Sequence, residues 1–170
     1  VIWQSPSLEL LRIAGVSDLD GDGTQEILVG SRDRVHVLSA ASGEVLWSLP
    51  TGSIGALGAV RIADFNQDSR PDLYVADAAC GSLGSLGDVA EVWSFASDPQ
   101  VPTRLFQLER KRRDYVCGVP DVVTDVTGDG QLDIVAFGSR FLYVYSGADG
   151  ALISASESVG AMPYAGVFIE

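Results

Sequence analysis

The chain has 170 residues, enough for one sizeable core, and its 46% of apolar residues with 19 Gly and seven Pro are typical of many short strands joined by turns. The 11 basic and 23 acidic residues give a net charge of −12, but ten of the acids lie in three short loops. The charge therefore argues only weakly against a nucleic-acid or anionic-membrane partner, although we expect that the protein does not bind nucleic acid. No apolar stretch approaches the length of a membrane span, so we expect no direct membrane insertion.

The first unit of predicted structure covers residues 8–50. Its apolar runs are four to eight residues long and rich in β-branched and aromatic side chains, without a helical period, so they are predicted as strands. Residues 1–6 (VIWQSP) match residues 45–50 (VLWSLP), and we interpret them as the outer strand of a preceding unit. The predicted strands of the first unit are Leu10–Ser17, Glu26–Gly30, Arg34–Ser39 and Glu44–Leu49.

Two further units repeat this plan. The second covers residues 57–108, with strands predicted at Gly58–Ala63, Asp72–Asp77, Val89–Phe95 and Thr103–Leu108. The third covers residues 115–156, with strands predicted at Val116–Thr124, Asp133–Gly138, Phe141–Ser146 and Ala151–Ser156. Residues 163–170 are similar to the opening strand of another unit.

An acidic loop of nine residues joins the first two predicted strands of each unit. The loops read DLDGDGTQE (18–26), DFNQDSRPD (64–72) and DVTGDGQLD (125–133), with side-chain oxygens recurring at positions 1, 3, 5 and 9. This spacing lets one segment wrap a hard cation such as calcium. An EF-hand is excluded because position 12 is Val29, Val75 or Ala136 where a bidentate Glu is required, and because the flanking segments are strands.

The spacing of the loops predicts an architecture. Their first residues are 18, 64 and 125, so successive loops lie 46 and 61 residues apart, and the first spacing fits a four-stranded propeller blade. Three blades are fewer than the usual 4–8 of a closed ring. We therefore predict an all-β fold: a β-propeller segment of four-stranded antiparallel blades, which is either part of a larger propeller or an open arc.

The pattern D-x-D-G-D-G-x-x-[DE]-[IL]-[LV]-V-G, followed by V-x-V-L-S-x-x-S-G-x-V-L-W, resembles the FG-GAP (integrin α-type, VCBS-like) repeat over essentially the whole chain. The resemblance implies a calcium-binding propeller, usually seven-bladed, on an extracellular, cell-surface or periplasmic protein. It also implies up to three Ca²⁺ sites, with position 7 contributing a backbone carbonyl. The implied ligands are Asp18, Asp20, Asp22, Thr24 and Glu26; Asp64, Asn66, Asp68, Arg70 and Asp72; and Asp125, Thr127, Asp129, Gln131 and Asp133.

The three loops differ in their expected affinity. Loop one has four carboxylates and Gly23 at the sharp turn, so we expect it to bind best. Loop three has Thr127 where an acid or amide is usual, and loop two has Ser69 in place of the turn glycine beside Pro71, which predicts a strained backbone. The alternative is that these are Asp/Gly-rich hairpin turns that need no metal.

Strand alternation predicts where a partner binds. The acidic loops join strands one and two, whereas the long Gly/Ser segment 78–88 joins strands two and three and therefore lies on the opposite face with the links between blades. Insertions often carry function, so we expect a protein or glycan ligand on that opposite face, with the remaining blades of the propeller as further partners. The alternative is that segment 78–88 is a surface loop that binds no partner.

The favoured function is a non-enzymatic, calcium-stabilised module for extracellular adhesion or interaction. The alternatives are the propeller domain of a secreted enzyme (a polysaccharide lyase or quinone-dependent dehydrogenase) and a purely structural segment. Residues 43–47 (GEVLW) resemble the blade signature of quinoprotein propellers, but the acids outside the loops suggest no catalytic centre, and we predict no catalytic residues. The lone His36 is interpreted as structural, and Cys80 and Cys117 as either free thiols or one disulfide.

Overall fold

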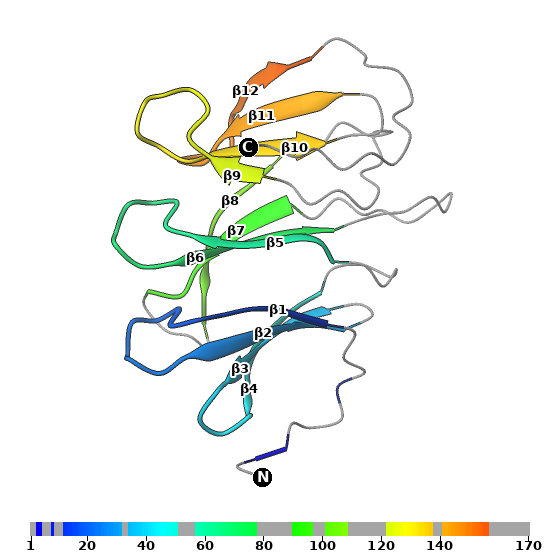
Figure 1. The fold of residues 1–170 in the computed structure, drawn as a ribbon, viewed down its shortest axis with the longest axis vertical. Helices are drawn as coiled ribbons and strands as arrows, with labels where there is room; N and C mark the ends of the chain where they lie inside the picture. Colours follow the sequence, from blue (N-terminus) through cyan, green and yellow to red (C-terminus); the bar gives the residue numbers. More distant parts are fainter. Residues whose placement is uncertain are drawn as a thin grey trace, which may run out of the picture.

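The structure is a computed structural model that describes residues 3–4, 8, 12–31, 34–50, 57–77, 90–96, 101–108, 122–137 and 141–156. The regular structure of these residues is entirely β, arranged as three antiparallel sheets of four strands (Figure 1). Each sheet keeps its strands in chain order. The predicted all-β fold of four-stranded blades is confirmed, and we call the three sheets blades one, two and three.

The strands occupy the predicted segments, with ends that differ by at most two residues, except that β9 is described only from residue 122. Blade one contains β1 (Arg12–Ser17), β2 (Glu26–Gly30), β3 (Arg34–Ser39) and β4 (Val45–Pro50). Blade two contains β5 (Leu57–Ala63), β6 (Asp72–Asp77), β7 (Ala90–Ser94) and β8 (Thr103–Gln107). Blade three contains β9 (Val122–Thr124), β10 (Asp133–Phe137), β11 (Leu142–Ser146) and β12 (Leu152–Ala155).

The blades stack face to face and bury one apolar cluster at each junction (Figure 1). Strand β6 shows why the middle blade has two buried faces, since successive side chains of a strand point to opposite sides. Leu73 and Val75 belong to the cluster shared with blade one, whereas Tyr74 and Ala76 belong to the cluster shared with blade three. All four are at most 1% exposed, so the blades are held together mainly by burial of apolar surface.

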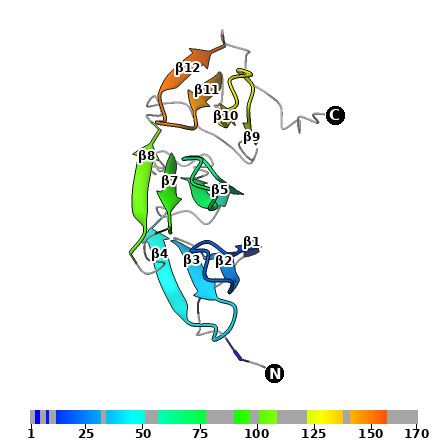
Figure 2. The same ribbon diagram turned by 90° about the vertical axis from the view of Figure 1, so that its left-hand side faces the viewer.

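The stack is an open arc. Figure 2 shows the last strands, β4, β8 and β12, along one side of the stack and the first strands along the other. Strands β1 and β5 contact each other across the first junction. The three described sheets do not close into a ring, which agrees with the predicted open, propeller-like arc.

The acidic loops between β1 and β2, β5 and β6, and β9 and β10 all project from the same side of the stack (Figure 1). This is the common face expected from strand alternation. The predicted partner-binding segment 78–88 lies outside the described residues, as do the links between blades (51–56 of the predicted link 50–57, and the links 109–114 and 157–163), the predicted strand 163–170 and both cysteines. Of residues 1–6, Trp3 and Gln4 are described; neither is in a strand, and the indole of Trp3 donates a hydrogen bond to the Ala40 carbonyl at 2.7 Å. Within the described ranges there is no helix long and apolar enough to cross a membrane.

Candidate metal loops

The first acid of each loop organises the turn through its two carboxylate oxygens. Oδ1 of Asp18 accepts a hydrogen bond from the Gly21 N–H at 2.7 Å, and Oδ2 accepts one from the Gly23 N–H at 3.0 Å. Asp125 makes the corresponding two bonds in loop three, at 2.6 and 2.9 Å. In loop two Oδ2 of Asp64 binds the N–H at position 6 at 2.8 Å, while its Oδ1 binds the N–H of position 5 at 3.1 Å. Side chains of this kind stabilise turns by bonding to nearby backbone.

Positions 5 and 7 are linked in the same way in all three loops, because the position-7 N–H donates to the position-5 carboxylate. The pairs are Thr24 with Asp22 at 2.6 Å, Arg70 with Asp68 at 2.9 Å, and Gln131 with Asp129 at 2.8 Å. The loops differ at position 3. Asp20 and Asn66 each accept the position-5 N–H at 3.0 Å, whereas the hydroxyl of Thr127 donates to Asp133 at 3.1 Å.

The last acid of each loop is buried and begins the second strand of its blade. Glu26, Asp72 and Asp133 are 2%, 0% and 2% exposed. Each accepts the backbone N–H of position 2, at 2.8, 3.0 and 3.0 Å respectively. The position-9 carboxylates thus connect the two ends of each acidic loop, at the edge of the apolar core.

Burial and clustering change the acidity of these groups. Burial raises the pKa of Glu26, the Leu19 N–H opposes this shift, and the three other carboxylates of loop one add to it. Burial also raises the pKa of Asp72, against hydrogen bonds that lower it. Asp125 is exposed instead, and the N–H groups of Gly130 and Gly128 lower its pKa. The ionised carboxylates of Glu26 and Asp72 are therefore electrostatically unfavourable without a compensating cation or proton.

Two observations test whether these residues fit a metal. Oxygens of Asp18, Asp20 and Asp22 lie within 4.8 Å of one another, the one group of three or more acidic, His or Cys ligands found in the described part of the chain. In loop two, Oδ1 of Asp72 is buried and has no hydrogen-bond partner among the described residues. Convergent carboxylates and an unsatisfied buried oxygen both suit a hard divalent cation that prefers oxygen ligands. The residues present therefore fit calcium, and loop one gathers the most charge, as the sequence predicts.

A family model described as an FG-GAP-like repeat matches residues 18–75. The match begins at the first acid of loop one and ends inside β6, so it includes the first two acidic loops and the strands between them. Residues 18–75 are therefore similar to the FG-GAP-like repeat. Loop three lies beyond the matched range and repeats the hydrogen bonds of the FG-GAP-like segment at positions 1, 5 and 9.

Comparison with solved structures supports the fold. The computationally designed Ika4 protein has a TM-score of 0.58 and 11% identity over 95% of this chain and 81% of its own. The designed Ika8 protein has a TM-score of 0.54 and 10% identity over 94% and 41%. The V. cholerae biofilm matrix protein Bap1 has a TM-score of 0.37 and 20% identity over 86% and 28%, so the chain spans less than half of Ika8 and of Bap1. A comparison with curated proteins found no match.

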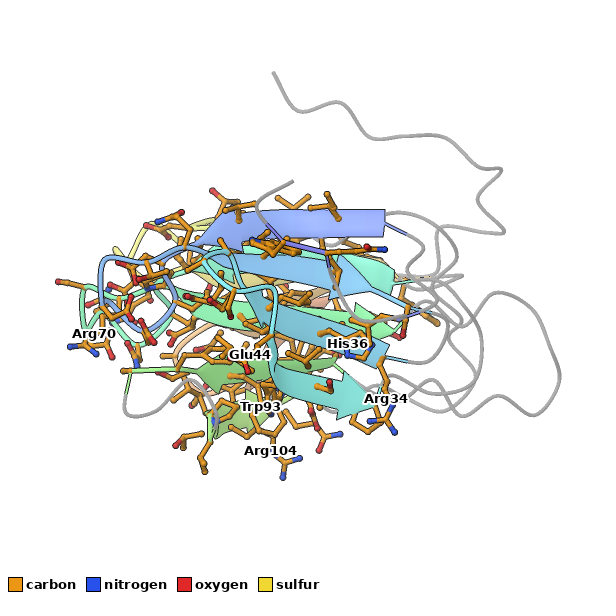
Figure 3. The ribbon with its side chains drawn as sticks, turned by 90° about the horizontal axis from the view of Figure 1, so that it is seen from below. Arg34, His36, Glu44, Arg70, Trp93 and Arg104 are labelled. Carbon is orange, nitrogen blue, oxygen red and sulfur yellow. The ribbon has the colours of Figure 1, made fainter. Side chains whose placement is uncertain are left out.

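The middle loop of the three is hydrogen-bonded to both neighbours, which the sequence did not predict. The guanidinium of Arg70 donates to the Asp20 carbonyl in loop one at 3.0 Å and to the Ala96 carbonyl at 2.6 Å. On the other side, the amide of Gln67 donates to the Gly130 carbonyl in loop three at 3.0 Å. Figure 3 shows Arg70 at the loop end of the blades, at the opposite end from Arg34 and His36.

The backbone of loop two confirms the predicted strain and extends it. Ser69 has a φ of 68°, where the other two loops have glycine, and Gln67 has a φ of 58°, again where the others have glycine. The left-handed region is unfavourable for residues with a Cβ. In the sequence, the signals for these inter-loop bonds were Gln67, where the other loops have glycine at position 4, and the basic residue Arg70 at position 7. Neither signal shows which neighbouring loop the side chain reaches.

The lone histidine lies at the other end of blade one and is structural, as predicted. His36 is 6% exposed, and its ring nitrogens lie 2.7 Å from the Ser48 hydroxyl and 3.2 Å from the Ser31 hydroxyl. Trp47 and Trp93 pack against each other with ring centroids 5.2 Å apart at the junction of blades one and two. Packing accounts for these two tryptophans.

Proposed function

We propose that this β-repeat segment is a calcium-stabilised, non-enzymatic module that mediates adhesion or other protein or glycan binding outside the cytoplasm. One observation carries the proposal: the same acidic loop, with the same backbone frame, occurs at the same edge of three successive blades, and in loop one its carboxylates converge. The FG-GAP-like match to residues 18–75 supports calcium as the cation.

Calcium has a structural role in this proposal. When bound, it would neutralise the clustered carboxylates and take up the oxygen of Asp72 that lacks a partner. The chain's own contribution is the backbone frame, which holds the acids in place, and the buried position-9 acids, which connect the loops to the second strands. A cation that binds only the folded state stabilises it by about 2.7 kcal/mol per site at a concentration of one hundred times its Kd.

The extracytoplasmic setting follows from the expected affinity. Calcium sites of extracellular modules have Kd values of roughly 10⁻⁴–10⁻³ M, which are filled where calcium is in the millimolar range. Surface loops built from exposed acids, such as Asp22 at position 5 of loop one, suit that range better than a fully enclosed site. The proposed ligand surface is the face opposite the acidic loops, where the sequence places its longest insertion, 78–88.

Thermal unfolding with calcium or EDTA tests the proposal. Saturating calcium should raise the Tm, by roughly 5–10 °C for each filled site at about 2.7 kcal/mol per site. Replacing both Asp20→Ala and Asp22→Ala should remove the contribution of loop one and leave that of loops two and three. An unchanged Tm in both millimolar calcium and EDTA would show that the metal assignment is wrong.

A matched control separates metal binding from turn formation. Asp149 accepts the Ala151 N–H at 3.0 Å in a turn outside the acidic loops, so it uses the same kind of bond without a cluster of acids. Asp149→Ala should lower the Tm with and without calcium by the same amount. Asp22→Asn keeps an oxygen for the Thr24 N–H but removes one of the clustered negative charges, so it should reduce the calcium-dependent shift and leave the Tm in EDTA the same or slightly higher.

A further inference from the structure

Arg70 connects two of the acidic loops. Within loop two, its backbone N–H donates to the Asp68 carboxylate at 2.9 Å, and its backbone carbonyl is the position-7 ligand that the repeat pattern implies. Its guanidinium extends out of loop two and donates through Nη1 to the Asp20 carbonyl of loop one at 3.0 Å and to the Ala96 carbonyl at 2.6 Å. Because Ala96 follows β7 in the same blade, that second bond holds the guanidinium in the position from which it reaches loop one.

The guanidinium also packs closely on loop one. A Cβ added at Gly21 would lie 3.5 Å from Nε and 3.6 Å from Cζ of Arg70, so the side chain lies against the backbone at position 4. Gly21 stands between Asp20 and Asp22, two of the three residues whose carboxylate oxygens converge. One side chain of loop two therefore contacts the backbone that carries two candidate ligands of loop one.

We propose that Arg70 couples the cation sites of loops one and two, so that calcium in either loop raises the affinity of the other. This inference rests on the proposed calcium binding. A cation that holds the Arg70 carbonyl fixes the backbone from which the guanidinium extends, so less conformational entropy is lost when the guanidinium bonds to loop one. A cation in loop one orders the Asp20 carbonyl and thereby fixes Arg70 in turn, since coupling between two sites is reciprocal.

Repulsion between two bound cations opposes this coupling but is small. The loops belong to sheets that stack about 10 Å apart, which exceeds the Debye length of about 8 Å at physiological salt. Loop one has four carboxylates, so it stays net negative with calcium bound. The hydrogen bonds of Arg70 therefore decide the sign of the coupling.

Calcium titration followed by NMR at physiological salt reports on each loop separately. The Ser69 N–H donates to the first acid of loop two and the Gly23 N–H to the first acid of loop one, so their amide signals follow calcium in the two loops. Replacing both Asp20→Ala and Asp22→Ala disables loop one but keeps the Asp20 carbonyl. The double replacement removes two negative charges, as many as one bound Ca²⁺ neutralises, so the charge near loop two stays matched. The affinity of loop two should fall about two- to tenfold, the range that corresponds to one exposed hydrogen bond.

Arg70→Ala removes the coupling without removing a ligand, because position 7 contributes its backbone carbonyl. In this variant, disabling loop one should leave the affinity of loop two unchanged. Arg70→Met, which keeps the packing on Gly21 and loses the donors, should behave in the same way, and the dispersion of the amide signals in EDTA shows whether each variant is folded. The matched control is Arg61→Ala, which removes the same charge from blade two; the Arg61 guanidinium donates to the carbonyl of its chain neighbour Val60 at 2.8 Å, so the variant should keep the coupling.

The outcomes distinguish this inference from the proposed function. If the Gly23 and Ser69 signals do not respond to millimolar calcium, calcium binding and the coupling are both wrong. If both respond but disabling loop one leaves the affinity of loop two unchanged or raises it, only the coupling is wrong. The coupling through Arg70 is also overturned if its size is the same in Arg70→Ala and Arg70→Met as in the original chain, or if Arg61→Ala abolishes it as completely.

Discussion

Ser69→Gly should stabilise the protein, although it removes a side chain. Ser69 has a φ of 68°, and the same loop position is Gly23 with a φ of 87° in loop one and Gly130 with a φ of 85° in loop three. The one hydrogen bond that fixes this position is made by the backbone, because the Ser69 N–H donates to Asp64 at 2.8 Å. Among the described residues the Ser69 hydroxyl has no hydrogen-bond partner, so glycine loses no bond.

The magnitude follows from two opposing effects. Holding a residue with a Cβ in the left-handed region costs roughly 1–2 kcal/mol, and glycine removes that cost. Glycine in turn has more freedom in the unfolded chain, which opposes folding by about 0.5–1 kcal/mol. The net gain is about 0.5–1 kcal/mol, which corresponds to a Tm increase of roughly 1–4 °C for a domain of this size.

Gln67→Gly is the matched control, because Gln67 has a similar φ of 58° but also bonds to the Gly130 carbonyl. An exposed hydrogen bond contributes about 0.5–1.5 kcal/mol, so its loss should cancel the relief of strain and leave the stability nearly unchanged. Urea unfolding in EDTA, with the two variants measured beside the original chain, gives both free energies. The reasoning is refuted if Ser69→Gly is neutral or destabilising, or if Gln67→Gly stabilises by the same amount.

Three further outcomes are expected. Arg70→Ala should lower the Tm in calorimetry because two carbonyl oxygens on neighbouring segments lose their donor, and Arg70→Lys should recover little of the loss if the bonds rather than the charge matter. Gly147→Ala should destabilise by about 1–3 kcal/mol in urea unfolding, since a Cβ there would meet the Leu132 carbonyl oxygen, which is rigid backbone; a neutral result would contradict the packing. In EDTA the free energy of unfolding should rise as the pH falls from 7 toward 4.5, because the pKa values of Glu26 and Asp72 are raised in the folded state. Proton binding by these two groups stabilises the folded chain, and this contribution is lost as the pH increases through their raised pKa values. A pH titration of stability with the opposite slope would contradict this.

The repeat made most of the fold predictable from the sequence. Strands and loops are local patterns, so β2 and β6 were predicted with the bounds that the structure has, and the acidic loops were placed on one face from strand alternation. The predicted strain at Ser69 needed only the alignment of three loops, two of which have glycine there. These features depend on residues that are close together in the sequence, so the sequence shows them directly.

The inter-loop bonds and the uneven burial of the blades were not predictable in this way. Arg70 was predicted as a ligand through its backbone carbonyl, but its side chain crosses to loop one, a contact that depends on how closely two blades stack. Val126 looks in sequence like any loop residue, and its exposure follows from blade three having no described sheet on its far side. Such properties arise from the packing of units, which a repeated motif does not encode.

Loop two, the middle loop of the three, has several features that would each destabilise the fold if considered alone. It has two residues with a Cβ in the left-handed region, Gln67 and Ser69, and a buried carboxylate oxygen on Asp72 without a partner. An unsatisfied buried group costs about 1–3 kcal/mol, and strained residues persist only where their surroundings fix them. Loop two is fixed on both sides, by Arg70 toward loop one and by its Gln67 amide toward loop three, and its blade is the one with two buried faces. Asp72, the last acid of loop two, is also the first residue of β6, the strand that contributes to both apolar junctions. A cation bound in loop two would therefore act directly on that strand. This site should contribute more to the stability of the whole stack than its smaller number of carboxylates implies.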